Sequence, residues 1–599
     1  MIRMRGLTCL LSLSAPAWAS SNSPWGMAFN NDGTGPDGPW AYIIAPVDAP
    51  SQTLGFYPSM IEMPMMVNAS ACQAQSAQCV MPTITAWTGS AAHDLYLNET
   101  SDEWDPSEWE DVHGGYVTEL MSLQGSMRYT TQRLSLGTVD LDGIAMAVAD
   151  NVTASFPNGD WYTVGIGYLS LYGGSTFTYD IPSGTRTLSL QLALGWSKGA
   201  YASMSFGLHM GSVMHKISGK LFWGGYDRAR CISEPITVES NSTFSLADIS
   251  IGVASGGSAF LNNTSSATEI DGLLQTNGSD SSTSLPLTAQ PDPGVPYMYL
   301  PGATCAAIAG YLPVTYDAGL ALYRWNTSAP EYEDIISSPH HLSFHFHTSG
   351  TSGTTQSIAI PFALLNLTLD YPITSDPTPY FPCRPYSPSD TSDPAAVVLG
   401  RAFLQGAHFA QNWHTGSVWL AQAPGPGYVD EDLKTIQETD TGLTPLPNAQ
   451  SWNETWADVL TPLNGSTTGD STSGGGTGSG SESDSGSGSS SSESSGNSDS
   501  GLSTGAKAGI GVGVAVGGIA LLGLVGALLL RRRRRGEGAE GGPDARPGAT
   551  ELPEERSMGY AAVPPQELAS AEMQELPADN AIKELQSHPK PHELPARYA

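Results

Sequence analysis

One apolar run near the C-terminus constrains the possible folds of this chain more than any other feature. Residues 508–530 include no charged side chain, and five arginines follow at 531–535. A helix of this length crosses about 30 Å of hydrocarbon, and arginine-rich flanks stay on the cytoplasmic side of a membrane. We therefore expect one transmembrane helix at 508–530, with the tail 531–599 inside the cell.

The N-terminus carries a second topological signal. Arg3 and Arg5 precede a short apolar run, and Ala17-Trp18-Ala19 has the small-x-small pattern of a cleavage site. Residues 1–19 are therefore predicted to be a signal peptide, which places the following residues outside the cell at the plasma membrane. All the Asn-x-Ser/Thr sequons precede the span, in agreement with this orientation. They are Asn68, Asn98, Asn151, Asn241, Asn262, Asn263, Asn277, Asn326, Asn366, Asn453 and Asn464.

Composition separates the flexible parts from the folded part. Residues 465–504 hold 17 Ser and 11 Gly, which cannot bury enough apolar surface to fold, so we interpret 424–507 as a linker. The tail 531–599 is rich in Pro, Glu and Ala and is predicted to be disordered. Its repeated Glu-Leu-Pro-Ala element, at 575–578 and 593–596, suggests the alternative of a docking motif for a cytoplasmic partner. The net charge of −33 argues against nucleic acid as a partner, since binding phosphates needs a basic patch.

The middle of the chain, residues 37–423, reads as an all-β domain. Short runs rich in Val, Ile, Tyr and Phe, such as 40–44 and 357–360, are broken by Gly, Pro, Asn and Asp. A segment of this length normally divides into two cores.

Five cysteines remain after signal cleavage, in a compartment that permits disulfides. Cys72 and Cys79 could close a small loop, and Cys305 and Cys383 a long one, which leaves Cys231 over. Spacing alone does not fix the connectivity.

Four segments resemble, in order, motifs of the pepsin-like aspartic proteases and especially of their membrane-anchored fungal members. Residues 47–52 resemble the Gly-Thr-Pro-Pro-Gln turn before the first catalytic strand. Residues 221–227 resemble the Phe-Gly-Gly-x-Asp strand near the lobe junction. Residues 399–404 resemble Leu-Gly-Asp-x-Phe-Leu, and 413–421 resemble the strand that ends in Val-Gly-Leu-Ala.

This resemblance implies a bilobal pepsin-like acid-protease fold with a cleft between the lobes. The N-lobe would cover about 40–231 and the C-lobe about 232–423. It favours a Cys305–Cys383 disulfide, and we expect Cys72–Cys79 as the other, with Cys231 free.

The resemblance also locates the catalytic positions. The family uses two Asp-Thr/Ser-Gly triplets, whose carboxylates share one proton. The first triplet aligns with Ser-Met-Ile at 59–61, and Glu62 lies on a strand that would point it elsewhere. The second aligns with Asp-Pro-Gly at 292–294. Asp292 is therefore a vestigial catalytic residue whose partner position holds Ser59, or alternatively a plain turn residue.

Neither of two further features supports a peptidase. Asp440-Thr441-Gly442 matches the triplet, but it follows the last motif and no apolar strand leads into it. The segment before the barrel is short, and the first basic residue after the signal is Arg128. Family zymogens usually carry a basic propeptide, and this short segment does not resemble one.

Three alternating histidines are the other candidate site. His341, His345 and His347 would share one face of a strand, where they could bind a metal such as zinc or sense pH. No Cys, Asp or Glu lies within the run, and the plain alternative is a row of residues facing solvent. We expect no cofactor.

Together these features predict a single-pass type I membrane glycoprotein whose aspartic-protease-like ectodomain is inactive. Its expected role is to bind or sense an extended peptide or glycan in the cleft. The alternatives are an active endopeptidase with an atypical dyad and a structural, wall-facing glycoprotein.

Overall fold

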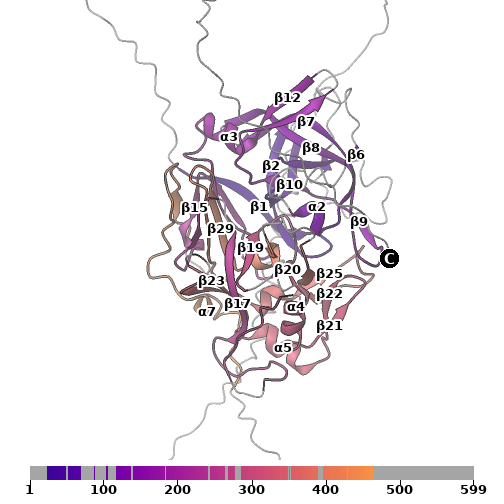
Figure 1. Ribbon diagram of the computed structural model, residues 1–599, viewed down its shortest axis with the longest axis vertical. Coiled ribbons are helices and arrows are strands. Elements are labelled where there is room, and N and C mark those ends of the chain that lie inside the picture. The colour runs from indigo at the N-terminus through magenta and orange to yellow at the C-terminus, as the bar shows by residue number, and fades with distance from the viewer. Residues whose placement is uncertain are drawn as a thin grey trace, which may run out of the picture. The chain divides into compact units, whose positions relative to one another are not determined.

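The computed structural model describes residues 23–48, 52–68, 86–87, 103–104, 116–136, 139–181, 184–240, 243–263, 267–276, 285–348, 350, 352–388, 395–427 and 430–464. Within these ranges the chain is mostly β-strand and its helices are short, as predicted (Figure 1). No helix in the described ranges is both long and apolar enough to cross a bilayer. The predicted signal peptide, transmembrane helix and tail lie outside them.

A central antiparallel sheet joins the two halves of the sequence. Its strands follow the order β1-β14-β13-β29-β30-β16. Their bounds are β1 Trp25–Thr34, β13 Ser205–His209, β14 Lys220–Trp223, β16 Ile236–Val238, β29 Ala407–Asn412 and β30 Ser417–Gln422. The halves meet where β13 pairs with β29. Because side chains alternate along a strand, Phe409 and Leu420 join the main core, whereas Ala410 and Trp419 join a smaller cluster.

The sheet of the first half, drawn in indigo to purple in Figure 1, is built around β3. Its strands are β2 Trp40–Asp48, β3 Gln52–Ser59, β4 Met65–Asn68, β5 Ala86–Trp87, β6 Glu103–Trp104, β7 Gln124–Leu136, β8 Val139–Ser155, β9 Trp161–Thr163, β10 Gly167–Ser170, β11 Thr176–Ile181 and β12 Gly184–Ser189. From Leu54 to Ser59 every residue of β3 is buried, because this strand lies between β2 and β10 inside the core.

The main sheet of the second half has the order β24-β23-β17-β19-β28-β20-β27, and β18 pairs with β17. Its strands are β17 Phe244–Val253, β18 Glu269–Ile270, β19 Leu287–Pro291, β20 Met298–Pro301, β23 His340–His347, β24 Thr355–Pro361, β27 Cys383–Tyr386 and β28 Val397–Leu399. A smaller sheet contains β21 Val314–Asp317, β22 Leu322–Trp325, β26 Thr378–Phe381 and β25 Leu367–Leu369.

Short helices connect these strands. They are α2 Val117–Leu120, α3 Gln191–Ser197, α4 Gly302–Ala309, α5 Pro330–Ser337, α6 Arg401–Leu404 and α7 Trp452–Thr455, with the 3-10 turns η3 Arg228–Arg230 and η4 Phe362–Leu365.

One strand arrangement occurs twice in the chain. In the first half β10 pairs parallel with β3 and antiparallel with β4, and β4 pairs parallel with β8. In the second half β28 pairs parallel with β19 and antiparallel with β20, and β20 pairs parallel with β27. The loops that follow β3 and β19 therefore occupy equivalent places, as a two-lobed domain predicts.

The packed body extends past both predicted ends of the domain, residues 37 and 423. It begins with β1, and beyond residue 423 the strand β31 (Leu433–Thr435) pairs with β15 (Gly225–Asp227). Trp456 is 2% exposed. Because 424–464 is polar in composition, the sequence does not indicate that it packs against the domain. The second face of β29 and β30 nevertheless carries Trp419, which Ile436 helps to cover. The linker therefore does not begin at residue 424.

Candidate functional site

The two equivalent loops meet inside the protein. The backbone N–H of Met60, which follows β3, donates to Asp292 Oδ1 at 3.2 Å. A Cβ placed on Gly294 would lie only 2.2 Å from Ser59 Oγ, so the missing side chain of Gly294 lets the loops touch. The structure therefore brings Ser59 and the Asp292 loop together, as the sequence alignment predicts.

The Asp292 carboxylate is fully enclosed. Its Oδ1 accepts hydrogen bonds from the N–H groups of Met60 and Gly294, and its Oδ2 accepts one from Tyr116 at 2.9 Å. The side chain is 0% exposed. Burial raises the pKa of Asp292, while the three backbone donors and the charge of Arg401 oppose that rise.

The segment around α2 covers this carboxylate. Val117 is buried, and its Cγ2 lies 2.4 Å from the position of a Cβ on Gly294. The carbonyl of Leu120 accepts a hydrogen bond from the Tyr299 hydroxyl at 3.3 Å. A substrate carbonyl could approach Asp292 only if this segment moved away. Sequence reasoning missed α2, because a helix of four residues leaves no periodic pattern.

No second acid completes a pair with Asp292 in the described part of the chain. Burial raises the pKa of Glu62 to about 7, but neither a hydrogen bond nor an electrostatic interaction links Glu62 to Asp292. The residue opposite is Ser59, whose Oγ accepts a hydrogen bond from the Ile61 N–H at 3.3 Å.

A buried arginine supports the Asp292 loop. Nη1 of Arg401 donates to the carbonyls of Pro293 and Gly294 at 3.1 and 2.8 Å. Its guanidinium carbon lies 4.1 Å from the centre of the Tyr57 ring, within the range of a cation–π contact. Arg401 stands where the family motif in 399–404 has Asp, and no sequence pattern indicates this supporting role.

A cavity of about 30 Å³ adjoins this arginine, with Asp37, Tyr57, Tyr168 and Arg401 in its lining. Among the described residues, Oδ2 of Asp37 and Nε of Arg401 are buried without a protein partner. Burial raises the pKa of Asp37, and the charge of Arg401 opposes this. The volume and the two polar atoms fit ordered water.

The three histidines share one face of β23, because the residues between them, Leu342 and Phe344 among others, are fully buried. They do not form a common site. His341 packs against Trp452, with ring centres 5.1 Å apart, and His347 borders a cavity at the end of the strand. His345 instead meets Glu269 at 3.8 Å, a contact that the sequence analysis missed.

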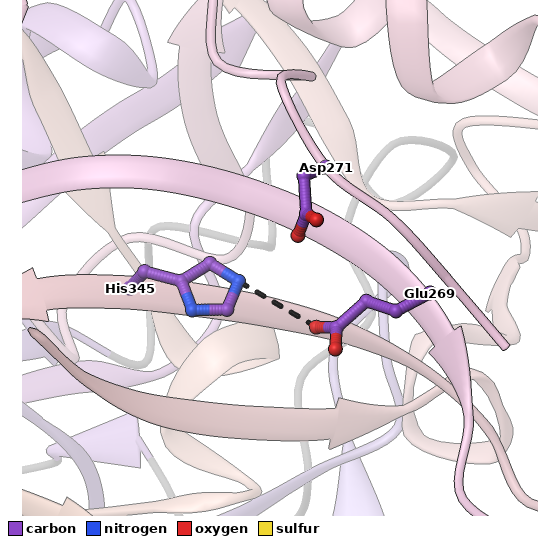
Figure 2. Close-up of side chains that lie close together, drawn as sticks. All are labelled: Glu269, Asp271 and His345. Atoms are coloured by element: carbon purple, nitrogen blue, oxygen red, sulfur yellow. Dashed lines mark ion pairs between the residues drawn. The ribbon is translucent and has the colours of Figure 1, made fainter. Parts of the chain in front are cut away.

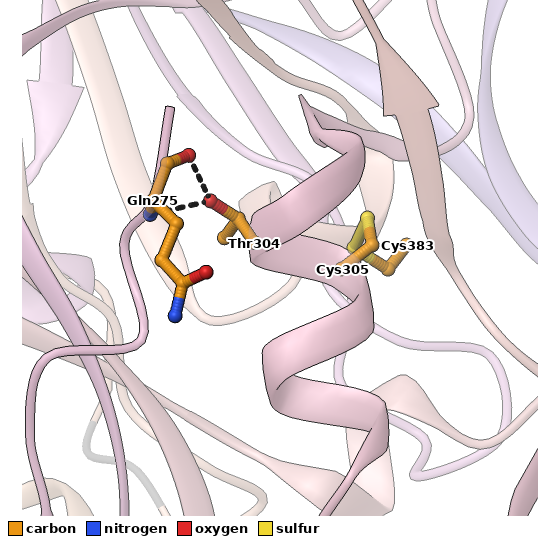
Figure 3. Close-up of a disulfide and its surroundings, with 4 residues drawn as sticks. All are labelled: Gln275, Thr304, Cys305 and Cys383. Atoms are coloured by element: carbon orange, nitrogen blue, oxygen red, sulfur yellow. Dashed lines mark hydrogen bonds between the residues drawn. A yellow bond between two sulfur atoms is a disulfide. The ribbon is translucent and has the colours of Figure 1, made fainter. Parts of the chain in front are cut away.

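The cysteines follow the prediction where they are described. A disulfide joins Cys305 in α4 to Cys383 in β27, beside the hydrogen bonds between Thr304 and Gln275 (Figure 3). Cys231 is buried and free. Cys72 and Cys79 lie outside the described residues.

The remaining predicted positions can also be placed. The sequons at Asn98, Asn241 and Asn277 lie outside the described residues. Those at Asn262, Asn326 and Asn464 are exposed, whereas the amide of Asn366 donates to the Tyr332 hydroxyl at 3.0 Å. The other described sequons are Asn68, Asn151, Asn263 and Asn453.

The Asp-Thr-Gly string at 440–442 belongs to the segment that covers the central sheet. The carbonyl of Asp440 accepts a hydrogen bond from the Asn412 amide, and that of Thr441 accepts one from the Trp419 indole. Both donors lie on strands of the central sheet, so this string has a packing role.

Comparison with known proteins gives structural likeness but no sequence match. No family model matches this chain, and no curated protein matches its sequence. Among solved structures, an aspartic proteinase from Irpex lacteus is similar at a TM-score of 0.41 and 12% identity, over 70% of this chain and 100% of that one. A likeness this weak establishes neither the activity nor the detailed fold of the chain.

Proposed function

We propose that this chain is a membrane-anchored, pepsin-like protein that has lost peptidase activity and binds a ligand at the cell surface. The ordered motifs between residues 47 and 421, the repeated strand arrangement and the Cys305–Cys383 disulfide support the pepsin-like part of the proposal. The apolar run 508–530 and the one-sided sequons support the anchor and the extracellular glycoprotein domain.

The observation that carries the loss of activity is the environment of Asp292. Peptide hydrolysis in this family needs two facing carboxylates that share a proton, so that one activates water while the other polarises the carbonyl. Here Ser59 is neutral, and three backbone N–H groups occupy the oxygens of Asp292. The remaining carboxylate therefore has neither an acidic partner nor a place for the attacking water.

The ligand that we propose is an extended peptide or glycan, and its site lies away from the Asp292 loop. The cleft was the expected site, but the Asp292 carboxylate is enclosed there and Val117 packs against Gly294. A cavity of about 700 Å³ instead adjoins the ends of β16, β17, β19 and β23. The hydroxyl-bearing residues Thr237, Thr243 and Thr288 line it. Together with the carboxylate of Glu239 they could bind the hydroxyl or amide groups of such a ligand.

A cleavage assay tests the loss of activity. Full-length protein in detergent would be incubated with denatured casein between pH 3 and 6, with and without pepstatin. We expect no pepstatin-sensitive cleavage and no difference between the wild type and Asp292→Ala. Pepstatin-sensitive cleavage that Asp292→Ala abolishes would instead establish an active endopeptidase.

A further inference from the structure

Three metal-ligating side chains converge at a site that includes no residue of the loops after β3 and β19. Glu269 lies in β18, Asp271 follows that strand, and His345 lies in β23. Their ligand atoms all lie within 4.8 Å of one another. Figure 2 shows the three side chains pointing toward a common space between the two segments.

The imidazole of His345 is held by a hydroxyl on each side. Its Nδ1 lies 2.6 Å from Ser357 Oγ, and its Nε2 lies 2.7 Å from Ser250 Oγ and 3.8 Å from Glu269 Oε1. Ser250 Oγ donates its hydrogen to Glu269 Oε1 at 2.7 Å, so it accepts a hydrogen bond from Nε2–H of His345. An ion at Nε2 would replace this hydrogen bond and would require the tautomer whose Nδ1–H is donated to Ser357. A metal-bound histidine commonly uses its other ring N–H in this way.

The backbone that carries the two acids is also fixed. The carboxylate of Asp248 accepts hydrogen bonds from Gly272 at 2.8 Å and from Leu274 at 3.4 Å. Glu269 itself pairs with Gly252 of β17. The turn after Asp271 is therefore attached to the strand beside β23, which brings all three ligands to one place before any ion binds.

Apart from His345, the two carboxylates have no basic partner in the described part of the chain. The only basic residues between 243 and 427, His aside, are Arg324, Arg384 and Arg401. Arg324 pairs with Asp317, Arg384 lies over aromatic rings, and Arg401 supports the Asp292 loop. In the described part of the chain no lysine or arginine forms an ion pair with Glu269 or Asp271. A divalent cation would neutralise the two carboxylates.

We propose that Glu269, Asp271 and His345 bind one divalent transition-metal ion of the zinc type. One imidazole nitrogen with two carboxylates suits zinc, whereas calcium and magnesium prefer oxygen ligands throughout. Zinc–ligand distances of about 2.0–2.2 Å require the three side chains to draw closer, which the exposed side chain of Glu269 permits. A water molecule would take the fourth position. This site does not depend on the proposed loss of peptidase activity.

The experiment compares zinc binding by full-length variants in detergent. After EDTA treatment and dialysis, Zn²⁺ is titrated against a chromophoric chelator, and Co²⁺ absorption reports the ligand field. Glu269→Gln with Asp271→Asn, and separately His345→Gln, should weaken one site by about 100-fold or more, because even outer-shell changes cost about 10–100-fold.

Matched controls separate this site from the rest of the chain. Glu333→Gln with Asp334→Asn removes the same charge from the exposed side of α5, and His347→Gln removes a histidine from the same strand. Both controls should retain the site. Zinc binding that is absent from the wild type, or equal in the wild type and in both site variants, would overturn the proposal.

Discussion

The loop after β3 and the loop after β19 follow strands with equivalent pairings, but the side chains that they present differ in charge. The first presents the neutral side chain of Ser59, and the second presents the carboxylate of Asp292. The charged loop depends on the neutral one, because Met60 donates one of the three hydrogen bonds to that carboxylate. The comparison shows that strand pairing determines where the loops meet, while the side chains at the meeting point are free to diverge.

The largest expected effect comes from removing the cation that donates hydrogen bonds to the charged loop. Arg401→Met would leave the carbonyls of Pro293 and Gly294 without their donor. It would also remove the positive charge that acts on Asp292 and Asp37. We expect a loss of about 3–5 kcal/mol in the free energy of unfolding, because two buried carbonyls each lose a hydrogen bond from a charged donor, worth about 1.5–3 kcal/mol.

Denaturant titration of the full-length protein in detergent measures this loss. Arg324→Met is the control, since its ion pair with Asp317 is partly exposed and should contribute about 1 kcal/mol or less. Equal losses for the two variants would show that Arg401 does not stabilise the Asp292 loop.

A smaller effect tests the contact between the loops. The first loop has Ile61 at the position that Gly294 occupies in the second, so only the second loop lacks a side chain there. Gly294→Ala would place a methyl group against Ser59 Oγ and Val117 Cγ2. We expect a destabilisation of about 1–3 kcal/mol from overpacking.

Gly442→Ala is the matched control for this change, because a Cβ at Gly442 would meet nothing within 4 Å. Thermal unfolding of both variants, followed by tryptophan fluorescence, makes the comparison. If Gly294→Ala melted together with Gly442→Ala, the loops would not be in the contact described here.

Sequence patterns predicted the parts of this site that depend on strands. The family resemblance, through its motif order, placed Ser59 opposite Asp292. The two-residue period of a strand placed the histidines of β23 on one face. The pairing of Cys305 with Cys383 came from the family resemblance and is confirmed.

What the sequence could not reveal arises from contacts between distant segments. Tyr116 donates to a carboxylate 176 positions away, and no local pattern marks a four-residue helix as a cover. Glu269 approaches His345 only because β18 and β23 both pair with β17. The predicted C-terminal end of the domain, residue 423, was wrong for a similar reason. A few apolar residues, such as Ile436 and Trp456, are enough to pack the polar segment that follows against the domain.

The junction between the halves offers a second comparison, in which His209 of β13 faces His408 of β29. Nε2 of His209 lies 2.8 Å from the Gln405 carbonyl, and its Nδ1 lies 3.2 Å from Arg230. Both ring nitrogens of His408 are buried without a partner in the described structure. Burial, followed by the charge of Arg230, lowers the pKa of His408 to about 3.

The smallest effect should therefore appear as a pH dependence. An unfolded histidine titrates near pH 6.5, so between about pH 6 and 4 the unfolded chain binds a proton that folded His408 excludes. Its contribution makes the folded state less stable as the pH falls, by up to about 1.4 kcal/mol per pH unit. The raised pKa values of Asp37 and Asp292 act in the opposite direction, because the folded state then takes up protons first.

The difference between the wild type and His408→Gln isolates the contribution of the histidine. The stability of His408→Gln should fall more slowly with falling pH than that of the wild type, by up to about 1.4 kcal/mol per pH unit. Denaturant midpoints at pH 6, 5 and 4 measure both slopes, and parallel slopes would mean that His408 takes up its proton without unfolding of the central sheet.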